Sequence, residues 1–144
     1  INIASIAGYM GLPFRGAYSP SKGALLLMSE ALRMEVKQFG IEVTTISPGD
    51  YATDIASRRY HTPVNENSPY AEVYAKQLQL MNEHVDSGGD PKEMAEKILK
   101  VINTKYPKVH YKQGSFLQKF SIVLKRLLPS KSYEKMLMKH YSLN

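Results

Sequence analysis

Apolar positions along the chain recur with two different periods, and each period predicts its own kind of element. Helical spacing of apolar residues predicts a helix over about 19–39, which begins near a proline and stops at Gly40. Short runs of β-branched and apolar residues predict strands at 1–5 and 41–46, and a weak strand at 109–111. The first half of the chain therefore alternates strand, helix and strand.

The second half of the chain shows mostly helical spacing, with breakers between the periodic segments. We expect helices over about 70–85, from Pro91 onward, over 116–128 and over 133–141. Strands that alternate with helices predict an α/β fold with a parallel sheet.

Composition limits the possible chemistry. The chain has 144 residues, 43% of them hydrophobic and 22% charged, which suits one globular domain. It has no cysteine, so disulfides and thiolate metal sites are excluded, and its four scattered histidines lead us to predict no metal site. No run approaches the roughly 20 apolar residues of a membrane span, and no signal peptide is visible, so we expect a cytoplasmic protein.

The charge is distributed unevenly. Residues 1–89 carry 7 basic and 9 acidic side chains, whereas residues 90–144 carry 12 basic and 4 acidic ones. Solvated lysines explain this asymmetry most simply. We expect no nucleic-acid partner, because no base-reading motif accompanies the charge.

Candidate chemistry lies in Tyr18-Ser19-Pro20-Ser21-Lys22, with Ser5 upstream. Tyr18 and Lys22 are four residues apart and share one face of a helix. An ammonium beside a phenol favours the phenolate, which lowers the tyrosine pKa towards the range of efficient proton transfer. A serine hydroxyl nearby could hold a substrate carbonyl, so these groups suit protonation of an oxygen while hydride reaches carbon.

A lone Tyr-x-x-x-Lys pair occurs readily by chance in a chain with 10 tyrosines, so its surroundings matter. A glycine-rich loop separates Ser5 from Tyr18, and Pro48-Gly49 ends the second predicted strand. Ligands of open α/β sheets bind at the carboxyl ends of strands, where all of these residues are expected.

With these motifs the chain resembles the short-chain dehydrogenase/reductase family. The segments at 3–8, 17–22 and 46–53 are similar to the family's serine, Tyr-x-x-x-Lys and Pro-Gly…Thr segments. The resemblance implies a Rossmann-like doubly wound parallel sheet, of which this chain would supply the C-terminal half. It also implies an NAD(P)-dependent oxidoreductase that interconverts a ketone and an alcohol.

The resemblance assigns three catalytic residues. Tyr18 would donate or accept the proton, and Lys22 would lower the tyrosine pKa and bind the nicotinamide ribose. Ser5 would hold the substrate oxygen.

The resemblance also assigns residues to the cofactor. Pro48 and Gly49 would shape the loop that meets the nicotinamide carboxamide, and Thr53 would assist there. From the sequence, Thr53 could equally be the N-cap of a following helix. For Asp50, the sequence leaves solvent exposure and capping of the next turn both open.

The family's phosphate-binding glycine loop has no counterpart here, and the sequence begins with Ile1, inside a predicted strand. We therefore expect an incomplete catalytic half that uses NADP or NAD, with the residues that choose between them outside the chain. The alternatives are a non-catalytic interaction or scaffold module with the same architecture, and a truncated inactive fragment.

The expected division is a Rossmann-type part at 1–115, with a substrate lid at about 54–89, and a basic amphipathic helical extension at 116–144. Apolar residues in the lid favour an apolar carbonyl or alcohol substrate. The extension could lie on an anionic membrane, over the substrate entrance or at a subunit interface. The resemblance also implies a homo-oligomer assembled through the helix at 19–39.

Overall fold

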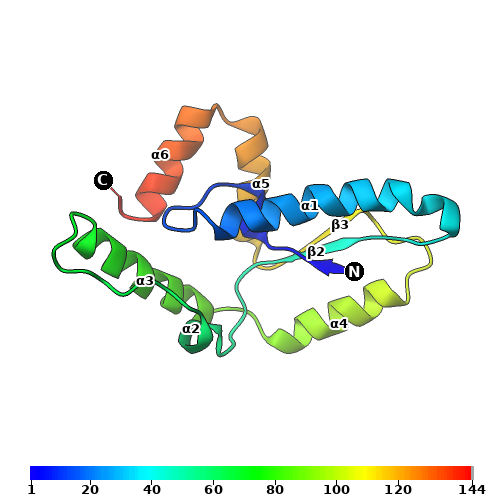
Figure 1. Cartoon of the computed structure of the whole chain (residues 1–144), viewed down its shortest axis with the longest axis horizontal. Helices are drawn as coiled ribbons and strands as arrows, with labels where there is room; N and C mark the ends of the chain where they lie inside the picture. Colours follow the sequence, from blue (N-terminus) through cyan, green and yellow to red (C-terminus); the bar gives the residue numbers. More distant parts are fainter. Residues whose placement is uncertain (144) are drawn as a thin grey trace.

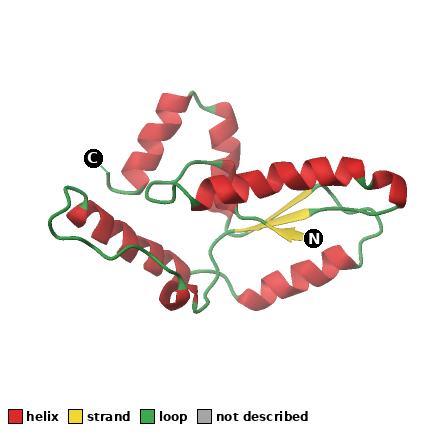
Figure 2. Ribbon diagram, viewed as in Figure 1, coloured by secondary structure: helices red, strands yellow, loops and turns green. Residues whose placement is uncertain are grey.

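The computed structural model describes residues 1–143 and is built around a three-stranded parallel sheet (Figure 1, Figure 2). Its strands are β1 (Asn2–Ile3), β2 (Thr45–Pro48) and β3 (His110–Gln113), and they lie in the order β1-β2-β3. Both strand pairs are parallel, with β2 in the middle. The predicted α/β fold with a parallel sheet is therefore confirmed.

The central strand begins later than the sequence pattern indicated. We predicted a strand at 41–46, whereas β2 spans Thr45–Pro48 and its first three residues are fully buried. The residues just before it form hydrogen bonds that involve side chains, in addition to the backbone bond from the Asn2 amide to the Thr44 carbonyl. The Val43 carbonyl accepts a hydrogen bond from Arg33, and the Thr44 hydroxyl donates to the Lys108 carbonyl at 2.6 Å.

Two long helices flank the sheet on opposite sides (Figure 1). They are α1 (Tyr18–Glu35), which joins β1 to β2, and α4 (Pro91–Ile102), which precedes β3. The helix predicted over 19–39 ends as an α-helix at Glu35, and a 3₁₀ turn, η2 (Lys37–Phe39), completes the segment. Gly40 ends the turn with a left-handed φ of 72°, a conformation that glycine adopts without strain.

Two further helices lie between β2 and α4. The longer one, α3 (Ala71–Asp86), agrees with the prediction at 70–85. The shorter one, α2 (Ile55–Arg58), lies outside the helices that the apolar pattern predicted. Four residues are too few to produce a periodic pattern, and an ion pair of 3.0 Å between Asp54 and Arg58 supports the single turn.

The last two helices are α5 (Phe116–Leu127) and α6 (Ser130–His140). A capping box starts α5, in agreement with the predicted helix. However, α6 begins three residues before the predicted position, because the Pro129 carbonyl accepts the first helical hydrogen bond, from Tyr133. The polar residues 130–132 gave no apolar signal.

These last helices pack on the start of the chain. A buried cluster joins the 3₁₀ helix η1 (Ile6–Tyr9) and the following Met10 to Ile122 of α5 and Tyr133 of α6. The Tyr133 hydroxyl donates to the Met10 sulfur at 2.8 Å.

The division of the chain into two parts at residue 115 stays a prediction. No helix within residues 1–143 is long and apolar enough to cross a membrane.

Candidate active site

Ser5 lies where the first two strands end. It is buried and forms the N-cap of η1, where its hydroxyl oxygen accepts a hydrogen bond of 3.1 Å from the Ala7 amide. The same hydroxyl donates to the Pro48 carbonyl over a long 3.5 Å. The end of β1 is thereby connected to the end of β2.

Two glycines bring the serine segment against the helix of the Tyr-x-x-x-Lys motif. A Cβ on Gly8 would lie 2.8 Å from the carbonyl carbon of Lys22, and a Cβ on Gly23 would lie 2.9 Å from the Gly8 carbonyl oxygen. Both distances are shorter than real side chains tolerate. Backbone therefore meets backbone between η1 and α1, beside Lys22.

Tyr18 and Lys22 lie in the first turns of α1. Tyr18 is 44% exposed, and the Lys22 ammonium lies 6.0 Å from the centroid of its ring. The ammonium also donates to the Ile3 carbonyl at 3.0 Å, two residues before Ser5. The lysine is therefore held near both the tyrosine and the end of β1.

The Pro48-Gly49 segment leaves the carboxyl end of β2. The Gly49 amide donates to the Gln113 carbonyl of β3 at 2.7 Å. Thr53 is exposed, and its hydroxyl donates to the Tyr51 carbonyl at 3.4 Å. The N-cap of α2 is Asp54, so the alternative of Thr53 as the helix cap is wrong.

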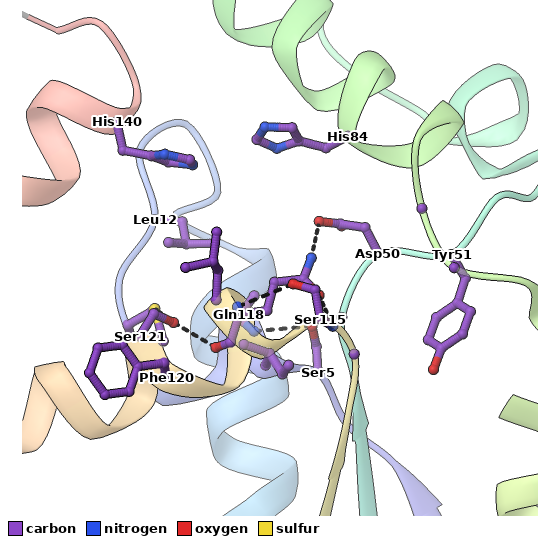
Figure 3. A pocket seen from close by; sticks show the side chains of 18 of the residues that line it. Ser5, Leu12, Asp50, Tyr51, His84, Ser115, Gln118, Phe120, Ser121 and His140 are labelled. Atoms are coloured by element: carbon purple, nitrogen blue, oxygen red, sulfur yellow. Dashed lines mark hydrogen bonds between the residues drawn. The ribbon is translucent and has the colours of Figure 1, made fainter. Parts of the chain in front are cut away.

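A cavity of about 750 Å³ lies next to these strand ends (Figure 3). Ser5 and Gly49 line it, whereas Tyr18, Lys22 and Thr53 are not among its lining residues. Its apolar wall comes from the first loop and from α5 and α6: Ile6, Met10, Leu12, Leu124, Met136 and Leu137.

Two histidines stand at one side of this cavity, away from Ser5 (Figure 3). The rings of His84 from α3 and His140 from α6 stack with their centroids 5.7 Å apart. Burial, followed by the nearby His84, holds the pKa of His140 below its usual value.

The sequence patterns missed the contact at the centre of Figure 3. The Gln118 side-chain amide donates to an Asp50 carboxylate oxygen at 2.7 Å. The only available signal was the Ser-x-x-Gln sequence of a capping box at Ser115, which predicts a helix start but not this partner. Burial raises the pKa of the neighbouring Tyr51, whose ring points away from Asp50 (Figure 3).

A parallel sheet with polar groups and a cavity at the carboxyl ends of its strands defines a doubly wound α/β protein. The family model described as short chain dehydrogenase matches residues 1–63, the region that holds Ser5, Tyr18 and Lys22. Together with the relatives below, this match shows that the chain belongs to the short-chain dehydrogenase/reductase family of oxidoreductases.

Curated relatives extend the similarity beyond the family model. The chain is 35% identical over 130 residues to a 3-ketodihydrosphingosine reductase of Bacteroides thetaiotaomicron. This match covers 90% of the chain and 48% of that relative. It is 35% identical over 114 residues to an NADPH-dependent 3-dehydrocapnine reductase of Ornithobacterium rhinotracheale, covering 77% of the chain and 40% of the relative. The chain thus spans about half the length, or less, of these relatives.

A solved structure agrees with this assignment. A short-chain dehydrogenase from Streptomyces avermitilis superposes with a TM-score of 0.65 at 25% identity. The superposition covers 99% of the chain and 49% of that structure. The Rossmann-type fold class is thereby confirmed.

Proposed function

We propose that the protein carrying this chain is an NAD(P)-dependent oxidoreductase that interconverts a ketone and an alcohol, with Tyr18 as proton donor and acceptor. The backbone contact between Gly8 and Gly23 carries this proposal, because it holds the Ser5 segment against the helix of Tyr18 and Lys22. The family assignment supports the reaction type.

Each of the three side chains has a distinct part in the proposed proton transfer. Tyr18 is exposed at the start of α1 and would donate the proton to the substrate oxygen. Lys22, held by the Ile3 carbonyl, would place a positive charge near the phenol while the proton is transferred. Ser5 lines the cavity and would donate to the substrate oxygen, which is the atom that gains negative charge.

The residues present fit the nicotinamide end of the cofactor. An ammonium has three donors, and the bond to Ile3 leaves Lys22 with donors for ribose hydroxyls. Pro48 ends β2, and Gly49 and Thr53 follow it. Doubly wound sheets bind ligands at such strand ends, and these residues would hold the carboxamide. NADP or NAD would supply the hydride, and the sequence lacks the glycine loop that would bind its phosphates.

The proposed substrate is a ketone, or the matching alcohol, with an extended apolar part. The wall of the cavity beside Ser5 is largely aliphatic. The Bacteroides relative, named for reducing a keto form of dihydrosphingosine, supports the same class of substrate.

We also infer a homo-oligomer through α1, because Leu27, Met28 and Met34 of this helix are exposed.

The test compares Tyr18→Phe with Tyr106→Phe in the natural protein that carries this chain; Tyr106 is exposed on the loop before β3 and serves as the matched control. We expect Tyr18→Phe to lower kcat by about 100-fold to 10,000-fold, since it removes the proton donor, while NAD(P)H still binds. Tyr106→Phe should leave kcat unchanged. Full activity of Tyr18→Phe would overturn the assigned role. Binding of neither NADPH nor NADH to the wild type would favour a scaffold instead.

A further inference from the structure

The segment that follows Gly49 is held between two loops from distant parts of the chain. On one side, the Gly49 amide donates to the Gln113 carbonyl at the end of β3. On the other side, the Gly89 amide donates to the Asp50 carbonyl, and the Ala52 amide donates to the Gly89 carbonyl, both at 3.0 Å. All of these contacts are between backbone atoms.

Gln118 adds a side-chain contact to this backbone framework. It lies in the first turn of α5, and its carbonyl oxygen accepts a hydrogen bond of 3.1 Å from the Ser115 amide. Its amide nitrogen donates to Asp50 at 2.7 Å. One planar group thus links the start of α5 to the segment after β2 (Figure 3).

Two glycines leave the space that this side chain occupies. A Cβ on Gly49 would lie 2.0 Å from the Gln118 carbonyl oxygen, and a Cβ on Gly114 would lie 2.7 Å from the same atom. Gly114 also has a φ of 156° and approaches the Gly49 backbone. The Gln118 amide is therefore packed against backbone on both sides and has little freedom to move.

We propose that Gln118 is a positioning residue that holds the Gly49–Asp50 segment against the first turn of α5. This inference rests on the proposed function, in which the same segment faces the nicotinamide. It also gives Asp50 a role, since its carboxylate is engaged by Gln118 instead of pointing freely to solvent.

The position requires an amide because the group must accept and donate at once. Glutamate at 118 would keep the acceptor for Ser115 but lose the donor, and its carboxylate would face that of Asp50. An additional Asp50→Asn change would restore the hydrogen bond in the opposite direction, because the asparagine amide could donate to the glutamate carboxylate. The double variant therefore tests whether this hydrogen bond is what holds the segment.

The experiment measures amide hydrogen exchange at residues 49–52 without cofactor, and the Kd of NADPH and NADH, in the natural protein. We expect Gln118→Glu to speed exchange at these residues by about tenfold or more, since a charge-assisted hydrogen bond is lost, and to weaken cofactor binding. The double variant Gln118→Glu with Asp50→Asn should recover both properties. Exchange that stays unchanged in Gln118→Glu, or fails to recover in the double variant, would overturn the proposal.

Two controls separate positioning from general stability. Gln79→Glu removes a similar bond between a glutamine and Glu83 on the surface of α3, so it should change neither property. Ser115→Ala removes the cap of α5 but keeps the Asp50 contact, so it should lower overall stability without selective exchange at 49–52. If the wild type binds neither cofactor, the proposed function fails, whereas the exchange data still decide whether Gln118 holds the segment.

Discussion

Gly8 and Gly23 determine how closely the serine segment approaches the helix of Tyr18 and Lys22. Neither has a left-handed φ, so backbone freedom is not what requires glycine there. The requirement comes from the space between η1 and α1, where the nearest atoms are backbone atoms that cannot rotate away. A methyl group added at either glycine would therefore force η1 and α1 apart.

We predict that Gly8→Ala lowers both stability and reductase activity, because the added Cβ meets the Lys22 backbone at 2.8 Å. Gly11→Ala is the matched control, since no atom lies within 4 Å of its added Cβ. Thermal unfolding and steady-state kinetics of the two variants would show the difference. Equal behaviour of the two variants would contradict the close contact.

At the residue scale, the sequence indicated the candidate catalytic residues but not the contacts that hold them in place. Ser5, Tyr18 and Lys22 follow from spacing and from family resemblance, and their roles stay predictions. The Gly8 contact and the Gln118–Asp50 bond depend on segments up to 68 residues apart. No local pattern encodes such partners, because they form only when the chain packs.

Two helices, α3 and α6, meet beside the cavity through a histidine stack and a buried glutamine. The Gln77 side chain is 1% exposed, and its amide donates to the Tyr141 carbonyl at 2.5 Å. His140 stacks on His84 and makes an edge contact with Tyr141 at 4.9 Å between ring centroids. Protonation of His140 would therefore occur next to the His84 ring.

This contact predicts lower stability at acidic pH. Burial and His84 lower the pKa of folded His140 from its usual value of 6.5, so the unfolded chain takes up a proton first as the pH falls. The contribution of this pair to stability is fully present above 6.5, the pKa of His140 in the unfolded chain. It decreases as the pH falls below 6.5 towards the lower pKa of His140 in the folded protein. Melting temperatures between about pH 8 and pH 5.5 would measure the loss.

The variant His84→Gln should reduce this acid sensitivity, because His84 is one of the two causes that lower the pKa of His140. His61→Gln is the control, since His61 is exposed elsewhere on the surface. An acid-dependent loss that is the same in His84→Gln as in the wild type would rule out the stack as its source.

The type of an element could be predicted where its apolar pattern was long. The first and last residues of the elements could not be predicted in this way. The helices α1, α3 and α5 follow from apolar periodicity, supported by Gly40 after α1 and by the capping box of α5. The start of β2 and the start of α6 depend instead on the partners of single backbone carbonyls: the Val43 carbonyl accepts from the Arg33 side chain, and the Pro129 carbonyl accepts from the Tyr133 amide. A four-residue helix such as α2 offers no periodicity at all.

Across the whole molecule, the two ends of the chain share one buried cluster. Ile6 and Met10 follow β1, whereas Ile122 and Tyr133 come from the last two helices. The sequence left three places open for the helical extension: an anionic membrane, the substrate entrance or a subunit interface. The structure places α5 and α6 on the cavity wall, which links the extension to the segment that holds Ser5.

We predict that Ile122→Ala destabilises the natural protein by about 2–5 kcal/mol, because it leaves a cavity where the side chain is 1% exposed. Leu127→Ala on the same helix should change the free energy of unfolding by less than about 0.5 kcal/mol, since Leu127 is 75% exposed. Urea unfolding followed by circular dichroism gives both values. A small effect of Ile122→Ala would mean that the cluster does not support the fold.

The framework around Gly49 consists largely of backbone contacts between the ends of strands and the loops that follow them. Apart from the glycines that leave room for them, such contacts depend on the number of residues in each loop more than on the identity of the other residues. Point substitutions on the outer surface of α6 can accumulate over evolutionary time without shifting this framework. A one-residue insertion or deletion between Gln113 and Gln118, or at Gly88-Gly89, would shift every contact in register, so lineages with this architecture should keep these loop lengths while their outer surfaces diverge.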